Sequence, residues 1–160
     1  MIIISLDQAL VNTGYAIFKN NKLQSYGSFN IKKSLPIEER LYQLHKELCN
    51  VSNIADDEKI DLLVMEDIQL QMGDVTTYKK LAYVQASIML WCLFQGVKFE
   101  IYAPTHWRSV LGGGFGKKRE EQKQNAIFYV KNNFGIDVDS DVADAICIGA
   151  AAIKERKNAF

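Results

Sequence analysis

The first residues of the chain constrain the fold most strongly, because they predict a buried strand that ends in a carboxylate. Residues 2–6 are three isoleucines, a serine and a leucine, and Asp7 follows directly. β-Branched residues in so short an apolar run favour a strand over a helix. A polar segment and Gly14 then lead into a second apolar run, 14–18, which predicts a hairpin. A carboxylate is costly to bury without a partner, so Asp7 either caps the turn or belongs to a functional site.

Length and composition fit one globular domain that spans residues 1–160. The hydrophobic fraction of 48% and the charged fraction of 24% are ordinary for a soluble protein. No apolar run reaches the ~20 residues of a membrane span, and the chain begins directly with a strand, so we expect a cytoplasmic protein without a leader. The three cysteines are widely spaced within apolar helical patterns, which predicts core residues in a reducing compartment: Cys49, Cys92 and Cys147.

The net charge is zero, but the charges are unevenly distributed along the chain. Residues 54–74 hold seven acidic residues and one lysine, which leaves six net negative charges. Residues 98–131 hold seven basic and three acidic residues, which leaves four net positive charges. This segregation allows a local basic surface on a neutral protein, and the alternative is that both segments are ordinary solvated faces.

The first third of the chain predicts three antiparallel strands and a helix. Asn20-Asn21 is a tight-turn signal, and residues 22–31 alternate as a third strand. Ser34-Leu35-Pro36 then opens a helix, with Pro36 suited to its first turn. The helix has one apolar face: Ile37, Leu41, Leu44, Leu48 and Val51. A solvated connection, Asp56-Asp57-Glu58, follows.

The middle of the chain predicts a second buried strand that also ends in a carboxylate. This strand, 60–66, finishes at Glu66, and a loop leads to a long helix over 75–95. The helix is apolar on more than one side, so it is either buried on both sides or part of a subunit interface. Gly96 ends it, and residues 97–102 alternate as a strand parallel to the 60–66 strand.

The last third predicts three more helices around a glycine-rich loop. A short helix begins at 103–108 and stops at the loop 112–116, which does not match a phosphate-binding loop. The next helix spans 117–133 and has a basic start. Ser140 is expected to cap the last helix, and residues 155–160 are expected to fray. The predicted inward face of the last helix is Val142, Ala145, Ile146, Gly149, Ala150 and Ile153.

Four acidic residues form a coherent set: Asp7, Glu66, Asp141 and Asp144. The last two lie three residues apart at a helix start, so their Cβ atoms are roughly 5–6 Å apart on one face. Taken alone they could merely complement the helix dipole. Together with two strand-end carboxylates they indicate a cation site, since unit charges ~5.5 Å apart repel by about 3 kcal/mol at an effective dielectric of 20. An all-oxygen ligand set favours Mg²⁺ or Mn²⁺ over Zn²⁺.

With these residues the sequence resembles the RuvC-type Holliday junction resolvases of the RNase H-like superfamily, including its phage-type members. Four segments carry the resemblance across nearly the whole chain: SLDQALVNTGYAIF (5–18), IDLLVMED (60–67), IYAPTHWRSVLGGG (101–114) and DSDVADAICIGAA (139–151). The resemblance implies an α/β, RNase H-like fold, with a five-stranded mixed sheet of three antiparallel and then two parallel strands flanked by helices. It also implies a homodimer, two Mg²⁺ ions per active site and paired nicks in four-way DNA junctions, in a bacterial or phage-infected bacterial cell.

In such a two-metal site one ion activates water and the other stabilises the leaving 3′ oxygen, which leaves 5′-phosphate and 3′-hydroxyl ends. We assign Asp7 as the bridging ligand, Glu66 to one metal ion and Asp144 to the other. Asp141 is either a ligand or the group that orients the attacking water.

Basic residues near the glycine loop are the candidates for DNA binding. Lys117, Lys118 and Arg119 lie at a helix start, where they can hold the phosphate backbone, and Arg108 is a further candidate. Lys118 either stabilises charge at the scissile phosphate or is an ordinary solvated lysine. His106 and Trp107 are assigned to packing or capping.

The sequence departs from the family pattern at two places. Asp7-Gln8-Ala9-Leu10 stands where family members commonly carry Asp-Pro-Gly-Leu. The loop 67–73 lacks the aromatic residue that members often place there to probe the junction, and the first aromatic is Tyr78. Ile68, Leu70 or Met72 can wedge between bases but stack less well. We therefore expect the protein to read backbone shape and charge, and to act on three-way junctions and forks as well as four-way junctions.

Three alternative functions compete with this assignment. Actin-like and sugar-kinase ATPases also begin with a strand, an Asp and a hairpin, but they need far more than 160 residues. A non-catalytic protein that binds branched DNA would gain by losing repulsive carboxylates near phosphate. A nuclease of the same superfamily acting on RNA or RNA–DNA hybrids is the third alternative.

Overall fold

The computed structural model describes residues 1–55, 59–70 and 74–158. Within these ranges the chain forms one five-stranded sheet and five helices. The strands are β1 (Ile2–Asp7), β2 (Asn12–Lys19), β3 (Lys22–Asn30), β4 (Leu62–Glu66) and β5 (Lys98–Tyr102). The helices are α1 (Ile37–Asn53), α2 (Val75–Gln95), α3 (Pro104–Val110), α4 (Arg119–Phe134) and α5 (Ser140–Asn158).

The strand order β3-β2-β1-β4-β5 confirms the expected mixed sheet. The first three strands are antiparallel, whereas β4 runs parallel to β1 and β5 parallel to β4. In the β1–β4 register Leu6 pairs with Met65, so the next residues, Asp7 and Glu66, lie at the same edge of the sheet. The α2 crossover between β4 and β5 supplies the parallel connection.

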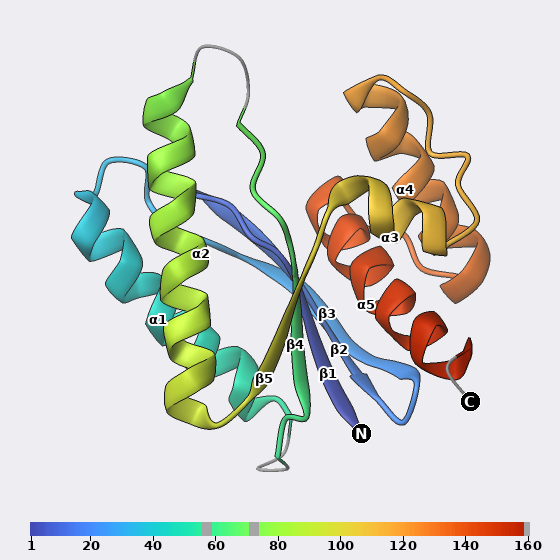
Figure 1. Cartoon of the computed structure of the whole chain (residues 1–160), viewed down its shortest axis with the longest axis horizontal. Helices are drawn as coiled ribbons and strands as arrows, with labels where there is room; N and C mark the ends of the chain where they lie inside the picture. The colour runs from blue at the N-terminus through green and yellow to red at the C-terminus, as the bar shows by residue number, and fades with distance from the viewer. Residues whose placement is uncertain (56–58, 71–73, 159–160) are drawn as a thin grey trace.

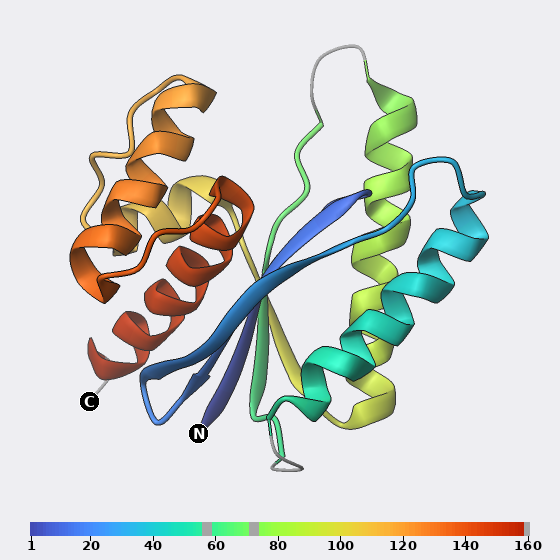
Figure 2. The same ribbon diagram turned by 180° about the vertical axis from the view of Figure 1, so that it is seen from behind.

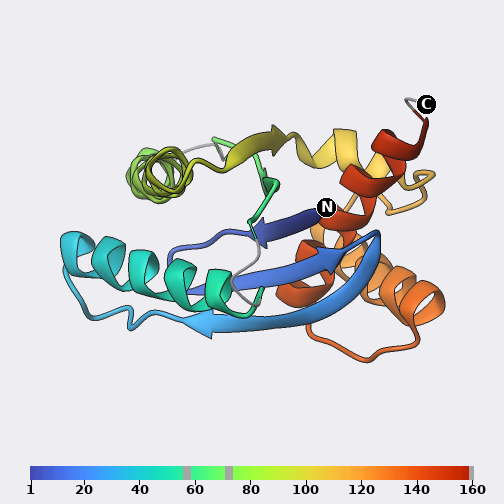
Figure 3. The same ribbon diagram turned by 90° about the horizontal axis from the view of Figure 1, so that it is seen from below.

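Helices cover both faces of the sheet, and each face has its own core (Figure 1). Helices α1 and α2 lie on one face, and α3, α4 and α5 lie on the other; the views from behind and from below show the same division (Figures 2 and 3). The pleat of β1 explains the two cores, because alternate side chains point to opposite faces. Ile2, Ile4 and Leu6 pack with the α1–α2 core, and Ile3 packs with the α5 core.

Helix α5 is buried on more sides than the single inward face that the sequence predicts. The additional buried residues are Ala143, Cys147, Ile148, Ala151 and Ala152, whereas Ala150 is only half-buried. The reason is its position, since α5 contacts β1 and β2 on one side and α3 and α4 on the other. Small side chains allow this close approach: the Ser5 hydroxyl donates a 2.7 Å hydrogen bond to the Ala145 carbonyl.

Several predicted element boundaries need correction. Strand β2 begins at Asn12, two residues earlier than expected, because Asn12 pairs with Asn30 of β3. The cap of α5 is Asp139, not Ser140: its Oδ1 accepts hydrogen bonds from the backbone N–H groups of Asp141 and Val142 at 3.1 and 2.9 Å.

Two helix ends also differ from expectation. Helix α4 begins at Arg119, since the Glu121 carboxylate accepts the N–H groups of residues 117 and 118 before the helix starts. The expected fraying from residue 155 is wrong up to Asn158. Glu155 accepts a 2.5 Å hydrogen bond from the Tyr102 hydroxyl and pairs with His106 at 2.8 Å, which ties the end of α5 to β5 and α3.

Helix α1 begins at Ile37, directly after Pro36, and its buried apolar residues are Leu44, Leu48 and Val51. All three cysteines are free; Cys92 and Cys147 are buried and Cys49 is half-buried. Over the described residues, no helix combines the length and hydrophobicity needed to traverse a bilayer. The predicted connection 56–58 and residues 71–73 and 159–160 lie outside the described residues.

Gly149→Ala is expected to destabilise the fold, although alanine is normally the better helix former by ~1 kcal/mol. A Cβ atom at Gly149 would lie 2.3 Å from Cε2 of Phe18 and 2.5 Å from Oγ of Ser5. Overpacking of this kind costs ~1–3 kcal/mol. Urea denaturation should show a lower free energy of unfolding, whereas the exposed Lys154→Ala change should stay within ~0.5 kcal/mol of the wild type. An unchanged or higher midpoint for Gly149→Ala would contradict the tight α5–sheet contact.

Candidate active site

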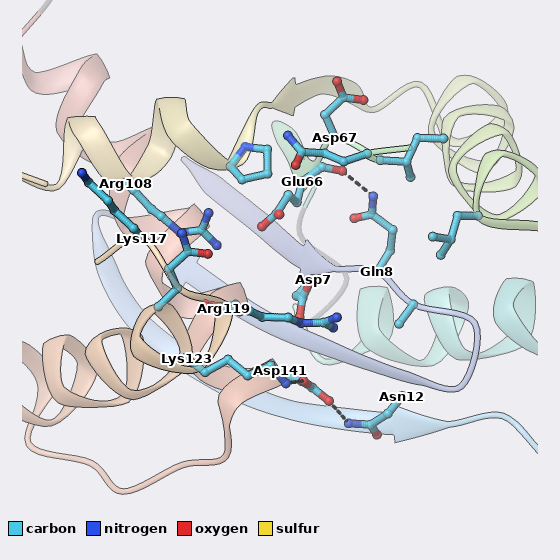
Figure 4. Close-up of a pocket in the computed structure, with 17 residues that line it drawn as sticks. Asp7, Gln8, Asn12, Glu66, Asp67, Arg108, Lys117, Arg119, Lys123 and Asp141 are labelled. Atoms are coloured by element: carbon cyan, nitrogen blue, oxygen red, sulfur yellow. Dashed lines mark hydrogen bonds and ion pairs between the residues drawn. The ribbon is translucent and has the colours of Figure 1, made fainter. Parts of the chain in front are cut away.

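Asp67 and the four acidic residues of the predicted site line one open pocket of about 630 Å³ at the carboxyl ends of β1 and β4 (Figure 4). Asp7 ends β1 and Glu66 ends β4, so the parallel register delivers both to the same edge. Asp141 and Asp144 come from the start of α5, one helical turn apart. The structure thus brings together all four acidic residues that the sequence singles out, from three separate elements.

The start of α5 reaches the pocket because a glycine lets it approach the sheet. A Cβ atom at Gly14 of β2 would lie 2.1 Å from the backbone oxygen of Asp141. No other residue type leaves room for this contact without moving the helix. The hairpin that follows Asp7 therefore positions the two aspartates of α5.

Asp7 and Asp144 are the carboxyl groups most affected by their surroundings. Burial raises the pKa of Asp7 well above its ordinary value, and the charges of Asp144, Glu66 and Asp141 raise it further. Burial also raises the pKa of Asp144 to about 7, with the charge of Glu66 as the next cause. Arg108 and Lys123 offset part of this effect for Asp144. The pocket therefore disfavours full ionisation of its acids unless a cation is present.

Glu66 is held by a tryptophan that the sequence analysis assigns only to packing or capping. The indole Nε1 of Trp107 donates a 3.0 Å hydrogen bond to Oε2 of Glu66. Burial raises the pKa of Glu66, whereas this hydrogen bond and the charge of Arg108 lower it. Trp107 is fully buried, so the packing assignment is correct but incomplete. His106 does pack, edge-to-face against Tyr102.

Asp141 lies against two polar partners that the sequence analysis does not single out. Nδ2 of Asn12 donates a 2.6 Å hydrogen bond to Oδ2 of Asp141, and Nζ of Lys123 lies 3.8 Å from Oδ1 (Figure 4). Nζ of Lys123 also donates to Oγ of Ser140 at 3.1 Å. A signal for Lys123 exists in the sequence, since it follows Arg119 by one helical turn. Asn12 offers no comparable signal.

The departure at residue 8 also contributes to the pocket. Nε2 of Gln8 donates a hydrogen bond to the backbone oxygen of Glu66, which links the turn after β1 to the end of β4. Gln8 is buried and lines the pocket. A glutamine amide thus provides a cross-strand contact at the position where the family pattern has proline.

Three of the four predicted DNA-binding residues line the pocket: Arg108, Lys117 and Arg119. Arg108 comes from α3, with its guanidinium 4.4 Å from the centre of the Trp107 ring. Lys118 is exposed and does not line the pocket. With Lys123, the pocket combines four acidic residues of the predicted site with four basic side chains.

The donor set fits a hard divalent cation in its chemistry. Carboxylate oxygens are preferred ligands of Mg²⁺, and Oδ1 of Asp144 is buried without a hydrogen-bond partner among the described residues. Among those residues, however, no three His, Cys, Asp or Glu side chains already lie close enough to hold one ion.

A family model and curated relatives identify the same family. The sequence model of one protein family, described as crossover junction endodeoxyribonuclease RuvC, matches residues 3–152 of this chain. A relative with that name from Rhodopirellula baltica is 27% identical over 150 residues, which cover 91% of this chain and 82% of the relative. One from Halothermothrix orenii is 26% identical, over 92% of this chain and 89% of the relative.

Solved structures share the fold at low sequence identity. Thermus thermophilus RuvC in complex with a Holliday junction substrate superposes with a TM-score of 0.80 at 15% identity, over 99% of this chain and 96% of that one. Fowlpox virus resolvase, solved with substrate Holliday junction DNA, gives a TM-score of 0.56 at 17% identity, over 96% and 99%. These likenesses confirm the RNase H-like resolvase fold.

The metal-free protein is expected to lose stability as the pH rises. Unfolding returns Asp144 from a pKa of about 7 to its ordinary value of 3.8, so the folded state holds the extra proton between these values. The free energy of unfolding therefore falls as the pH rises through this window. Thermal melts in EDTA should therefore give a lower melting temperature at pH 8 than at pH 5. In Asp144→Asn this difference in melting temperature should be smaller by at least ~2 °C. Mg²⁺ should raise the melting temperature at pH 8 far more than at pH 5. An equal change of melting temperature with pH in the wild type and in Asp144→Asn would contradict the raised pKa of Asp144.

Proposed function

This chain belongs to the RuvC family of crossover junction endodeoxyribonucleases, and we propose that it is a structure-selective DNA endonuclease that resolves Holliday junctions. The observation that carries the proposal is the convergence of Asp7, Glu66, Asp141 and Asp144 on one pocket at the edge of the sheet. The basic residues of the same pocket support a polyanionic substrate, since phosphate contacts from Lys and Arg dominate affinity for DNA. A junction binder without nuclease activity has no use for this convergence.

The proposed cofactor is Mg²⁺, which Mn²⁺ can replace, with two ions per active site. Asp7, Glu66 and Asp144 are the proposed ligands, and Asp141 completes the set from the more exposed side of the pocket. When bound, such ions lower the pKa of water and stabilise charge on a leaving oxygen, which yields 5′-phosphate and 3′-hydroxyl ends.

The chain's own residues orient the substrate in this scheme. Arg108, Lys117 and Arg119 hold phosphates along the pocket, while Lys118, outside it, contacts the backbone further along the DNA. Lys123 and Asn12 orient the carboxylate of Asp141.

The loop after Glu66 supports selection by shape instead of by base sequence. Within its described part Ile68 is half-buried and lines the pocket, and Leu70 is 60% exposed. Aliphatic side chains wedge between bases but provide none of the ~1–3 kcal/mol per base of aromatic stacking. Met72, the other candidate wedge, lies outside the described residues. We therefore propose that three-way junctions and forks are substrates besides four-way junctions.

The proposed assembly is a homodimer formed through the exposed apolar side of α2. Four large side chains lie on this helix at helical spacing with 51%, 53%, 66% and 82% exposure: Tyr83, Leu90, Leu93 and Phe94. Several large apolar side chains exposed along one helix are typical of a subunit interface. A two-fold dimer also matches a four-armed substrate with two symmetric scissile bonds.

We place the activity in the cytoplasm of a bacterial or phage-infected bacterial cell. The curated relatives come from bacteria such as Rhodopirellula baltica and Halothermothrix orenii. The proposed substrate, branched DNA, is found in that compartment.

Replacing single acids should abolish cleavage without abolishing binding. Asp7→Asn, Glu66→Gln and Asp144→Asn are each expected to slow junction cleavage at least ~100-fold, because even groups that only orient a metal ligand contribute ~10–100-fold. Junction affinity should persist or increase, since each change removes negative charge that faces phosphate. The assay uses labelled four-way junctions of varied central sequence, a three-way junction, a fork and a linear duplex, with Mg²⁺ for cleavage and Ca²⁺ for binding.

Asp137→Asn is the matched control, since this exposed aspartate pairs with Lys131 away from the pocket. It should cut at the wild-type rate. Near wild-type cleavage by Asp7→Asn would refute the metal assignment. Cleavage confined to one short sequence, with forks untouched, would show that the loop after Glu66 reads bases.

Charged residues in the exposed side of α2 should separate the dimer. We expect the wild type to have about twice the monomer mass of 18.1 kDa by light scattering at micromolar concentration. The double change Leu90→Glu and Phe94→Glu should give the monomer mass, since like charges would face each other across the interface. Phe128→Glu, which changes an aromatic residue of α4 that is 64% exposed, should leave the mass unchanged. A monomeric wild type would refute the proposal.

A further inference from the structure

Trp107 contacts three functionally different groups at once. Its indole N–H donates to Oε2 of Glu66 at 3.0 Å, and Arg108 lies over its ring at 4.4 Å. The ring of Phe115, from the glycine loop that precedes Lys117, packs edge-to-face against it at 5.3 Å. The buried side chain of Trp107 therefore contacts a proposed metal ligand, a proposed phosphate-binding residue and the glycine loop.

We infer that Trp107 is a positioning residue that fixes the Glu66 carboxylate for cation binding, while its buried ring packs beside Arg108 and against Phe115. The inference rests on the proposed function, because it assigns a role toward the same site. It predicts that loss of the indole N–H weakens cation binding even when the ring is kept.

The second tryptophan of the chain shows that packing alone does not require this hydrogen bond. Trp91 is 2% exposed in the core between the sheet and α1–α2, and its Nε1 is buried with no partner among the described residues. Trp107 is equally buried, yet its N–H points at a carboxylate. Hydrogen bonds to a charged acceptor are roughly twice as strong as neutral ones. The same residue type thus serves packing at one position and orientation at the other.

The geometry indicates what the hydrogen bond achieves. It occupies Oε2 of Glu66 and leaves Oε1 to a cation, so the carboxylate is oriented before a ligand arrives. The buried ring of Trp107 does not move freely, because Phe115 packs on it and Arg108 lies over its face. A group that orients a metal ligand in this way typically contributes ~10–100-fold to metal affinity or activity.

The test compares Trp107→Phe with Trp91→Phe, two changes that remove the same atoms from two buried sites. Trp107→Phe keeps an aromatic ring beside Arg108 and Phe115 but removes the donor. We expect it to weaken Mn²⁺ binding, measured by calorimetry on the full chain, and Mg²⁺-dependent junction cleavage by ~10–100-fold. Junction binding in Ca²⁺ should change less than threefold. Trp91→Phe should match the wild type in all three measurements, and equal metal affinity in both variants would overturn the inference.

A second measurement decides the question without a change at Trp107. In Trp91→Phe, Trp107 is the sole tryptophan, since the chain has two, so its indole ¹H–¹⁵N signal is assigned directly. We expect this signal to be shifted by Glu66→Ala and by Mg²⁺ titration of the metal-free protein. A signal that responds to neither would overturn the inference. This result holds even if Trp107→Phe fails to fold, because the measurement does not use that variant.

The outcomes of these experiments distinguish failure of this inference from failure of the proposed function. If the wild type binds Mn²⁺ but cuts no junction, the proposed function fails, while calorimetry and the indole signal still decide the role of Trp107. If the wild type cuts junctions and both phenylalanine variants cut equally, the inference fails and the proposed function stands.

Discussion

The repulsion among Asp7, Glu66 and Asp144 is the interaction on which the rest of the structure depends. Burial is the main reason that their charged forms are disfavoured, and neighbouring carboxylates add to it: Asp144, Glu66 and Asp141 for Asp7, Asp67 for Glu66, and Glu66 and Asp141 for Asp144. The protein offsets this cost only partly, through the Trp107 hydrogen bond to Glu66 and the charges of Arg108 and Lys123. Relief of this repulsion by a bound cation is the physical basis of the proposed metal site. Oδ1 of Asp144 is buried and has no hydrogen-bond partner among the described residues, as expected of a ligand to the proposed cation.

Holding such groups together requires rigid elements, and the sheet and α5 provide them. The β1–β4 register aligns two strand ends, and no side-chain flexibility enters that alignment. Helix α5 is locked against the sheet by the Ser5–Ala145 hydrogen bond and by close contacts at Gly14 and Gly149. Its far end is tied to β5 and α3 through Glu155. The helix therefore cannot retreat from the sheet to relax the repulsion.

A neutral protein suits a polyanionic substrate here because its charges are segregated. The basic side chains of the pocket lie beside the acids that they partly compensate, which under the proposed function would attract phosphate and a divalent cation to the same place. Helix α2 lies on the opposite face of the sheet from α4 and α5 (Figure 1). Assembly through α2 would therefore leave the basic residues of α4 free to contact DNA.

The sequence by itself determined the helices and strands, the four acidic residues of the site and the apolar residues on more than one side of α2. These features are local: periodicity within a strand or helix, and a residue type at its end, need no knowledge of distant contacts. The tertiary structure alone decided the partners of the acids. Trp107 is 41 residues from Glu66, and Asn12 is 129 residues from Asp141. The all-round burial of α5 likewise depends on what packs against the helix. Such contacts form only when segments far apart in the chain come together, and no local pattern encodes which distant side chain will donate a hydrogen bond.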